Sequence, residues 1–148
     1  MTIGLRLDLA EYEHNDVEKG DYLALTATAS HHGFAGHTLF WAGLHHLEGF
    51  IDELDALDTS LHGRAQLRCG WGDDVLFELA IEPQGHSGRL RASIDIASDS
   101  SRAEPSRLVT TFVLLPNALT SFRRALACII KEESSGPAEL EIDPDAAV

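Results

Sequence analysis

Positive charge is scarce in this chain. Its 148 residues include 11 Lys and Arg against 24 Asp and Glu, which gives a net charge of −13. Contacts to nucleic-acid phosphates need clustered Lys and Arg, so this balance argues against a nucleic-acid partner. An acidic protein instead attracts basic partners and associates with them rapidly. The same charge also serves solubility, which is the simpler interpretation.

Cysteine and long apolar runs are scarce too. Cys69 and Cys128 are too few for a disulfide framework, and both fall inside apolar patterns, which indicates buried thiols. No apolar run approaches the ~20 residues of a membrane span. The first residues lack the basic and apolar regions of a secretory signal. We therefore expect a cytoplasmic protein with no membrane partner.

The length and the apolar content are those of one globular domain. The hydrophobic fraction is 44% over 148 residues, which suffices for a core. After residue 132 the chain carries one glycine, two prolines and several acids, a composition typical of mobile segments. We therefore predict a single α+β domain over residues 1–132 and a flexible acidic tail over residues 133–148.

Hydrophobic periodicity in the first half predicts strands and then a helix. Alternation with period two indicates strands at residues 3–10 and 22–30, and the glycines in 31–37 indicate a turn or a short bent strand. From Thr38 the apolar spacing becomes four, three, four, three, which predicts an amphipathic helix that Thr38 caps and that ends near Asp58. The apolar stripe of this helix is Phe40, Leu44, Leu47, Ile51 and Leu54.

The second half returns to period two and then predicts another helix. Four strands are expected at residues 63–71, 75–82, 89–97 and 107–115, and the turns between them are too short for parallel crossovers. Pro116 then suits a helix start, and an apolar stripe continues to Ile130. The predicted fold is an α+β antiparallel sheet of about six strands, in the order strand pair, helix, four-strand meander, helix. A sandwich-like arrangement would satisfy the same pattern.

The last predicted strand is apolar on both faces and so needs cover on both. This cover can come from the N-terminal strands, as in a sandwich, or from a second copy of the protein, because open apolar faces of several hundred Å² are rare on monomers. We expect a homodimer in which Val109, Val113 and Leu115 lie in or beside the interface.

Five of the eight histidines fall between Ser30 and Phe50. A zinc site needs three or four ligands that converge on the ion. His45 and Glu48 have the i, i+3 spacing that lets two helical side chains share a ligand, whereas adjacent helical residues diverge by about 100°. Two interpretations stay open. Either the histidines flank the helix stripe as half-exposed residues, or they form a metal-binding protein or metal-dependent enzyme with the ligand set His31, His32, His37, His45 and Glu48.

Motifs for other chemistry are missing from the sequence. It contains no GxSxG, no glycine-rich phosphate loop and no HExxH, and neither cysteine has an obvious activating partner. We therefore predict no catalytic residue and no cofactor.

The order of elements over residues 20–130 resembles small acidic bacterial proteins of the wall-associated-protein (Wap) immunity type. These have a helix with an "L..F...L..L" rhythm, a "G.A.L" strand and a closing helix with "L..F...L". The matching positions are Leu44, Leu47, Ile51 and Leu54, then Gly63, Ala65 and Leu67, and finally Leu119, Phe122 and Leu126. The resemblance implies a non-catalytic protein that binds and blocks a contact-delivered toxin.

Charge and resemblance together indicate where such a partner would bind. An acidic inhibitor can cover a cationic groove of a basic toxin domain by charge complementarity. The candidate contact residues are the acids of the first predicted helix, Glu48, Asp52, Glu53 and Asp55.

Overall fold

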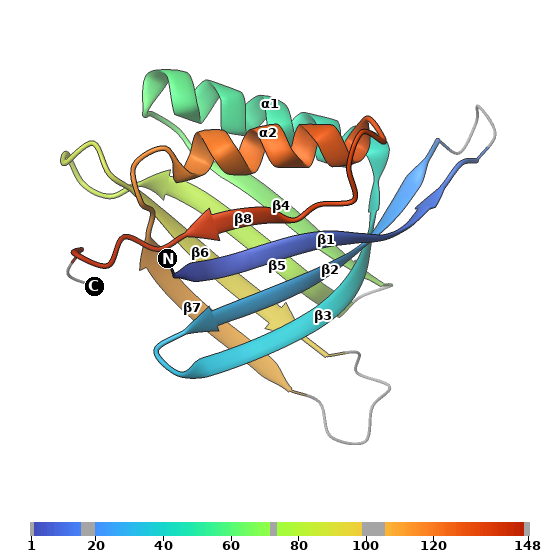
Figure 1. The fold of residues 1–148 in the computed structure, drawn as a ribbon, viewed down its shortest axis with the longest axis horizontal. Coiled ribbons are helices and arrows are strands. Elements are labelled where there is room, and N and C mark those ends of the chain that lie inside the picture. Colours follow the sequence, from blue (N-terminus) through green and yellow to red (C-terminus); the bar gives the residue numbers. More distant parts are fainter. Residues whose placement is uncertain (1, 16–19, 72–73, 99–105, 147–148) are drawn as a thin grey trace.

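The computed structural model describes residues 2–15, 20–71, 74–98 and 106–146. The elements in chain order are β1 (Ile3–Glu13), β2 (Tyr22–His31), β3 (Phe34–Gly43), α1 (Leu44–Ser60), β4 (Ala65–Trp71), β5 (Asp74–Pro83), β6 (Leu90–Ala97), β7 (Arg107–Val113), α2 (Ala118–Ile130) and β8 (Ala138–Glu141). They form two antiparallel four-stranded sheets (Figure 1). The α+β class is confirmed, but the single sheet of about six strands is wrong.

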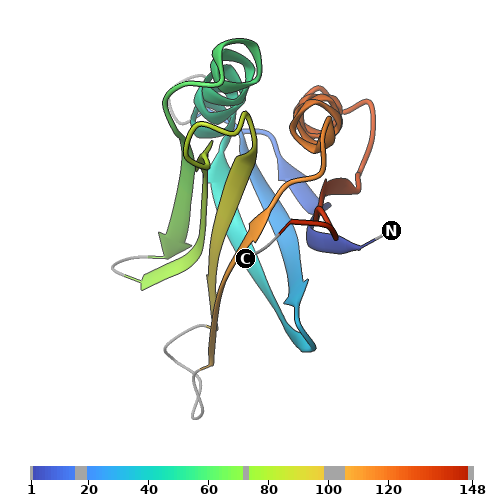
Figure 2. The same ribbon diagram turned by 90° about the vertical axis from the view of Figure 1, so that its left-hand side faces the viewer.

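The two sheets share one core. The first sheet has the order β3-β2-β1-β8 and the second β4-β5-β6-β7. Alternate residues of both sheets enter a single buried cluster, in which the rings of Phe40 on β3 and Phe77 on β5 stack with centroids 4.4 Å apart. The helices α1 and α2 lie side by side at one end of the sheets and add Phe50 and Phe122 to the core (Figures 1 and 2). None of the helices in the described residues is long and apolar enough to cross a membrane.

Strand β3 is the first correction to the sequence-based prediction. The predicted helix from Thr38 begins only at Leu44, and Thr38 is a buried residue within β3. Gly43, not Thr38, is the N-cap of α1, and the Thr38 hydroxyl donates to the Ala97 carbonyl at 3.0 Å. Phe40 and Leu44 are four residues apart, which suits a helix. Tertiary pairing with β2 nevertheless holds this segment extended, and it buries Thr38, Phe40 and Ala42 with period two.

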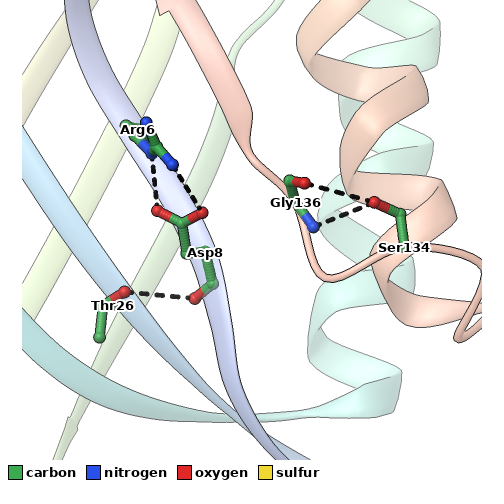
Figure 3. A network of polar contacts seen from close by, with 5 residues as sticks. All are labelled: Arg6, Asp8, Thr26, Ser134 and Gly136. Carbon is green, nitrogen blue, oxygen red and sulfur yellow. Dashed lines mark hydrogen bonds and ion pairs between the residues drawn. The ribbon is translucent and has the colours of Figure 1, made fainter.

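The C-terminal segment is the second correction. Residues 138–141 form β8 and pair with β1, and Ala138 and Leu140 are fully buried. The chain enters β8 through a turn in which the Gly136 amide donates to the Ser134 hydroxyl at 3.1 Å, close to the ion pair of Arg6 and Asp8 on β1 (Figure 3). The predicted flexible acidic tail over 133–148 is therefore wrong for residues 138–143. The last two residues lie outside the described part.

The C-terminal segment also joins the two sheets. Leu114, just after β7, forms an antiparallel bridge with Ile142, just after β8, and the Asp143 amide donates to the Val113 carbonyl at 2.9 Å. The Asp143 carboxylate is 8% exposed and lies 2.7 Å from the Arg89 guanidinium. Sheet edges β7 and β8 therefore cover each other at this end.

Strands β4 to β7 form the predicted antiparallel meander. Val113, assigned to the homodimer interface, is 1% exposed within a single chain and so is not available for contact with a second copy. The homodimer itself stays a prediction. Leu115 is partly buried against the same core, whereas Val109 is 64% exposed. The inner face of β7 packs so tightly on β1 that a Cβ on Gly4 would overlap the ring of Phe112. Residues 72–73 and 99–105, which fall between the predicted strands, lie outside the described residues.

Candidate functional site

The outward face of α1 carries the acids that the sequence singled out. The helix buries Leu47, Phe50, Leu54 and Leu57 against the sheets, which turns the opposite face to solvent. Glu48, Asp52 and Asp55 follow one another at i, i+4 and i+7, so they form one stripe along that face. The side chains of Glu48 and Asp55 are 50% and 65% exposed. Helix α1 has five acids and no Lys or Arg in 17 residues.

The four predicted contact acids do not have equal surroundings. Glu53 lies on the flank of α1 beside β4, where its carboxylate accepts the Gln66 amide at 3.2 Å. Asp55 is 3.8 Å from the Arg123 guanidinium of α2, a weak solvent-exposed contact. Asp52 is exposed and makes no hydrogen bond or ion pair with a described residue. We therefore define the acidic stripe as Glu48, Asp52 and Asp55 and assign Glu53 a structural role.

The predicted five-residue metal set does not form one site. His31 pairs with Phe34 at the start of β3, whereas His45 and Glu48 follow the end of β3. A ten-residue strand separates these two groups by about 30 Å, at roughly 3.3 Å per residue. Ligands of one ion converge within a few ångströms, so the two groups cannot share an ion. No group of three or more His, Cys, Asp or Glu ligands with metal-site geometry occurs in the described residues.

The histidines before and after β3 contact nearby side chains instead. The ring centroids of His31 and His32 are 3.8 Å apart, and His31 Nδ1 lies 2.9 Å from the Thr110 hydroxyl of β7. Partial burial, and secondarily the neighbouring His32, lower the pKa of His31. At the other end His45, 91% exposed, lies 3.1 Å from Glu48. The His31 contact fixes the β2–β3 hairpin on the second sheet.

The sequence did not indicate the surroundings of His14. Its Nδ1 lies 3.2 Å from the Asp21 carboxylate and its Nε2 lies 2.7 Å from the Glu132 carboxylate, while its ring stacks on Tyr12. Both carboxylates only accept hydrogen bonds, so two good contacts require both ring nitrogens to carry protons. The hydrogen bond to Glu132 is the main cause of the raised pKa of His14. His14 and Glu132 are 118 residues apart, so no local pattern could reveal this contact.

A groove lies along β3, and no pattern in the sequence predicts it. Residues 34–39 form one side, and the ends of β5, β6 and β7 form the other, with Leu76, Ile96 and Leu108 among its lining residues. Its volume is about 590 Å³. We call this feature the β3 groove. Most of its lining residues belong to the start of β3, the end of β6 and the start of β7, and these segments lie away from α1 and α2 (Figures 1 and 2).

The outer face of the second sheet carries paired charges. Arg68 lies 3.7 Å from Glu78, and Arg91 lies 2.7 Å from Glu82 on the neighbouring strand. Cross-strand pairs of opposite charge are the expected arrangement for solvent-facing strand residues. Arg68 and Arg91 are therefore each balanced by an acid on this face.

No protein-family model, no curated protein and no solved structure matches the chain. The resemblance to the Wap immunity type therefore stays a prediction.

Proposed function

We propose that the protein is a non-catalytic binding module whose acidic stripe receives a basic protein partner, in the manner of a bacterial immunity protein that neutralises a basic toxin domain. The observation that carries the proposal is α1 itself, which presents Glu48, Asp52 and Asp55 to solvent and contains no Lys or Arg. A cationic groove of a partner would meet a stripe of one sign.

The energetics of this surface favour rapid and salt-sensitive association. Rim charges mainly raise the association rate, which can reach 10⁸–10⁹ M⁻¹s⁻¹ at low salt and falls as salt screens the field. The net charge of −13 adds a long-range attraction for a cationic partner. Helix α1 rests on the core through Leu47, Phe50 and Leu54, so the stripe is held in place before a partner arrives.

The test compares two charge reversals of equal size. Glu48→Lys with Asp52→Lys removes the centre of the stripe, and the control Glu11→Lys with Glu13→Lys changes the net charge equally at exposed residues of β1. The proposal predicts that the gene beside the one for this protein encodes a basic toxin domain, and this domain is the probe. We expect the stripe variant to associate with it at least about tenfold more slowly than the control, with a weaker dependence on salt.

Two outcomes would reject the proposal. One is that both variants associate with the toxin domain at the same rate, which would leave only the net charge as a cause. The other is that the wild-type protein neither binds nor inhibits the domain at micromolar concentration.

A further inference from the structure

Strand β3 is an edge strand without the usual protection. It pairs with β2 on one side, over ten residues with no bulge, and among the described residues no strand pairs with its other side. Natural sheet edges are shielded by charged side chains, prolines, bulges or covering segments. Residues 34–43 contain no proline and no Asp, Glu, Lys or Arg. In an antiparallel edge strand every second residue directs its N–H and C=O away from the sheet, so β3 offers unpaired backbone groups.

The other three sheet edges differ from β3. At one end β7 and β8 meet through the bridge of Leu114 and Ile142. Strand β4 lies beside α1, and the Gln66 amide on β4 is bonded by the Glu53 carboxylate. These three edge strands also carry charged residues, namely Arg68 on β4, Arg107 on β7, and Glu139 and Glu141 on β8, whereas β3 carries no Asp, Glu, Lys or Arg.

Charge is also absent from the whole hairpin that presents β3. Residues 22–43 contain no Asp, Glu, Lys or Arg, although the chain has 35 such residues in all. The described residues expose five large hydrophobic side chains, and three of them lie in this hairpin: Tyr22, Phe34 and Leu39. Phe34 is 70% exposed and Leu39 is 46% exposed. Exposed apolar groups gathered on one uncharged element mark an interaction surface.

Three contacts hold β3 in position over the ends of the second sheet. A Cβ on Gly36 would lie 3.3 Å from Cβ of Leu108, which shows how closely β3 approaches β7. The Thr38 hydroxyl is bonded to the Ala97 carbonyl, and Phe40 stacks on Phe77. The edge therefore needs no rearrangement before it pairs, and a partner strand avoids that ordering cost.

We propose that the β3 groove binds an extended, uncharged peptide segment of a partner protein, which adds to the free edge of β3 as a further strand. Residues 34–39 offer about 17 Å of edge, enough for five or six residues of the segment. Backbone hydrogen bonds supply affinity and alternate side chains supply specificity. This surface is separate from the acidic stripe, and the proposal does not depend on it.

The lining of the groove sets the chemistry of the segment. Leu76, Ile96 and Leu108 line the groove together with Thr38, Ser98 and Ser106. The inward residues of the segment, every second one, are therefore uncharged, and those that face Leu76, Ile96 and Leu108 are apolar. The charged lining residue Arg107 has its guanidinium paired with Asp95, with Nε 2.8 Å from Oδ1. A charged inward residue would lose its hydration with no partner in return. Outward residues of the segment lie near Leu39 and solvent, where polar side chains are tolerated.

The second sheet leaves space beside the β3 edge for a single extended strand but not for a second copy of the chain. Pairing of β3 with β3 of another copy about a two-fold axis would put both second sheets on the same face of the joined sheet. The ends of β5, β6 and β7 already occupy the space beside the β3 edge on that face. A lone extended segment brings no such sheet.

The test uses a displayed library of random twelve-residue peptides, selected on the wild-type protein. Phe34→Asp with Leu39→Asp alters the groove, and Leu61→Asp with Val109→Asp is a matched control at apolar residues that are 42% and 64% exposed elsewhere. We expect enriched peptides with apolar residues at alternate positions. They should bind the groove variant about a hundredfold more weakly and the control as well as wild type. If aspartate destabilises the hairpin, the corresponding serine variants replace both pairs.

Hydrogen exchange supplies the second readout. At a peptide concentration of about 100 times Kd, the unpaired amides within residues 34–39 should exchange about a hundredfold more slowly. The proposal is overturned if no peptide is enriched, if both aspartate variants lose affinity equally, or if these amides do not respond. It is also overturned if the protein alone is a dimer with these amides already protected, because the second copy would then be the occupant.

Discussion

Replacement of Leu140 by alanine tests whether the C-terminal segment belongs to the folded domain. Leu140 is fully buried on β8, opposite Leu5 of β1, and joins the shared core. A Leu→Ala change at such a site lowers the free energy of unfolding by about 2–5 kcal/mol, through lost apolar burial and the cavity left behind. A domain of this size is stable by about 5–15 kcal/mol, so the loss is a large fraction.

The assay is urea unfolding monitored by circular dichroism, with Glu139→Ala as the control. Glu139 is next to Leu140 on β8 but on the opposite face of the strand, where substitutions stay within about 0.5 kcal/mol. With a urea slope of about 2 kcal/mol per molar, the midpoint of Leu140→Ala should fall by about 1–2.5 M. A midpoint within about 0.3 M of wild type would refute the reasoning, because it would mean that residues 133–148 are the mobile tail that their composition suggests.

Three further predictions follow from single residues. The pKa of His14 is raised in the folded state, so the stability that His14 contributes should be complete below about pH 6.5 and be lost as the pH rises through the folded-state pKa. NMR titration should give a pKa of His14 above 6.5. The substitution His14→Gln should remove this part of the pH dependence of stability. Gly4→Ala should lower the free energy of unfolding by about 1–3 kcal/mol through overpacking. Gly49 lies on the exposed face of α1, where an added Cβ would have no neighbour within 4 Å, so Gly49→Ala should raise the free energy of unfolding by about 0.5–1 kcal/mol. Urea unfolding measures both changes. Burial raises the pKa of Cys69 to about 12. In a Cys128→Ser variant, the Cys69 thiol of the folded protein should therefore react with a disulfide reagent at pH 8 far more slowly than the same thiol in the unfolded chain. Equal reaction rates would contradict the burial of Cys69.

The two proposed binding surfaces can be altered independently of each other. Helix α1, which carries the acidic stripe, and the start of β3, which lines the β3 groove, lie at opposite ends of the sheets (Figures 1 and 2). Charge reversal at Glu48 and Asp52 should therefore leave peptide binding intact, and aspartate at Phe34 and Leu39 should leave association with a basic domain intact. Sites this far apart with no shared partners contribute independently.

Hydrophobic periodicity was sufficient to predict a helix or a strand wherever a single period continued along the whole element. The alternation in residues 65–97 determined three strands of the meander, and short turns left antiparallel pairing as the only choice. The stripe of Leu119, Phe122 and Leu126 determined α2 in the same way. The acids of α1 were also found from sequence, because charges opposite an apolar helix stripe face solvent.

Tertiary structure decided the segments whose local pattern allowed two answers. Residues 38–43 fit a helix by the spacing of Phe40 and Leu44, and pairing with β2 made them a strand. Residues 138–141 are too short and too acidic to predict as a strand, yet β1 pairs with them and buries Ala138 and Leu140. The clustered histidines were separated by the length of β3, and the β3 groove arose where that strand crosses the second sheet. Each of these outcomes depends on contacts between residues far apart in the chain, and hydrophobic periodicity reports only which face of a segment is buried, not which partner buries it.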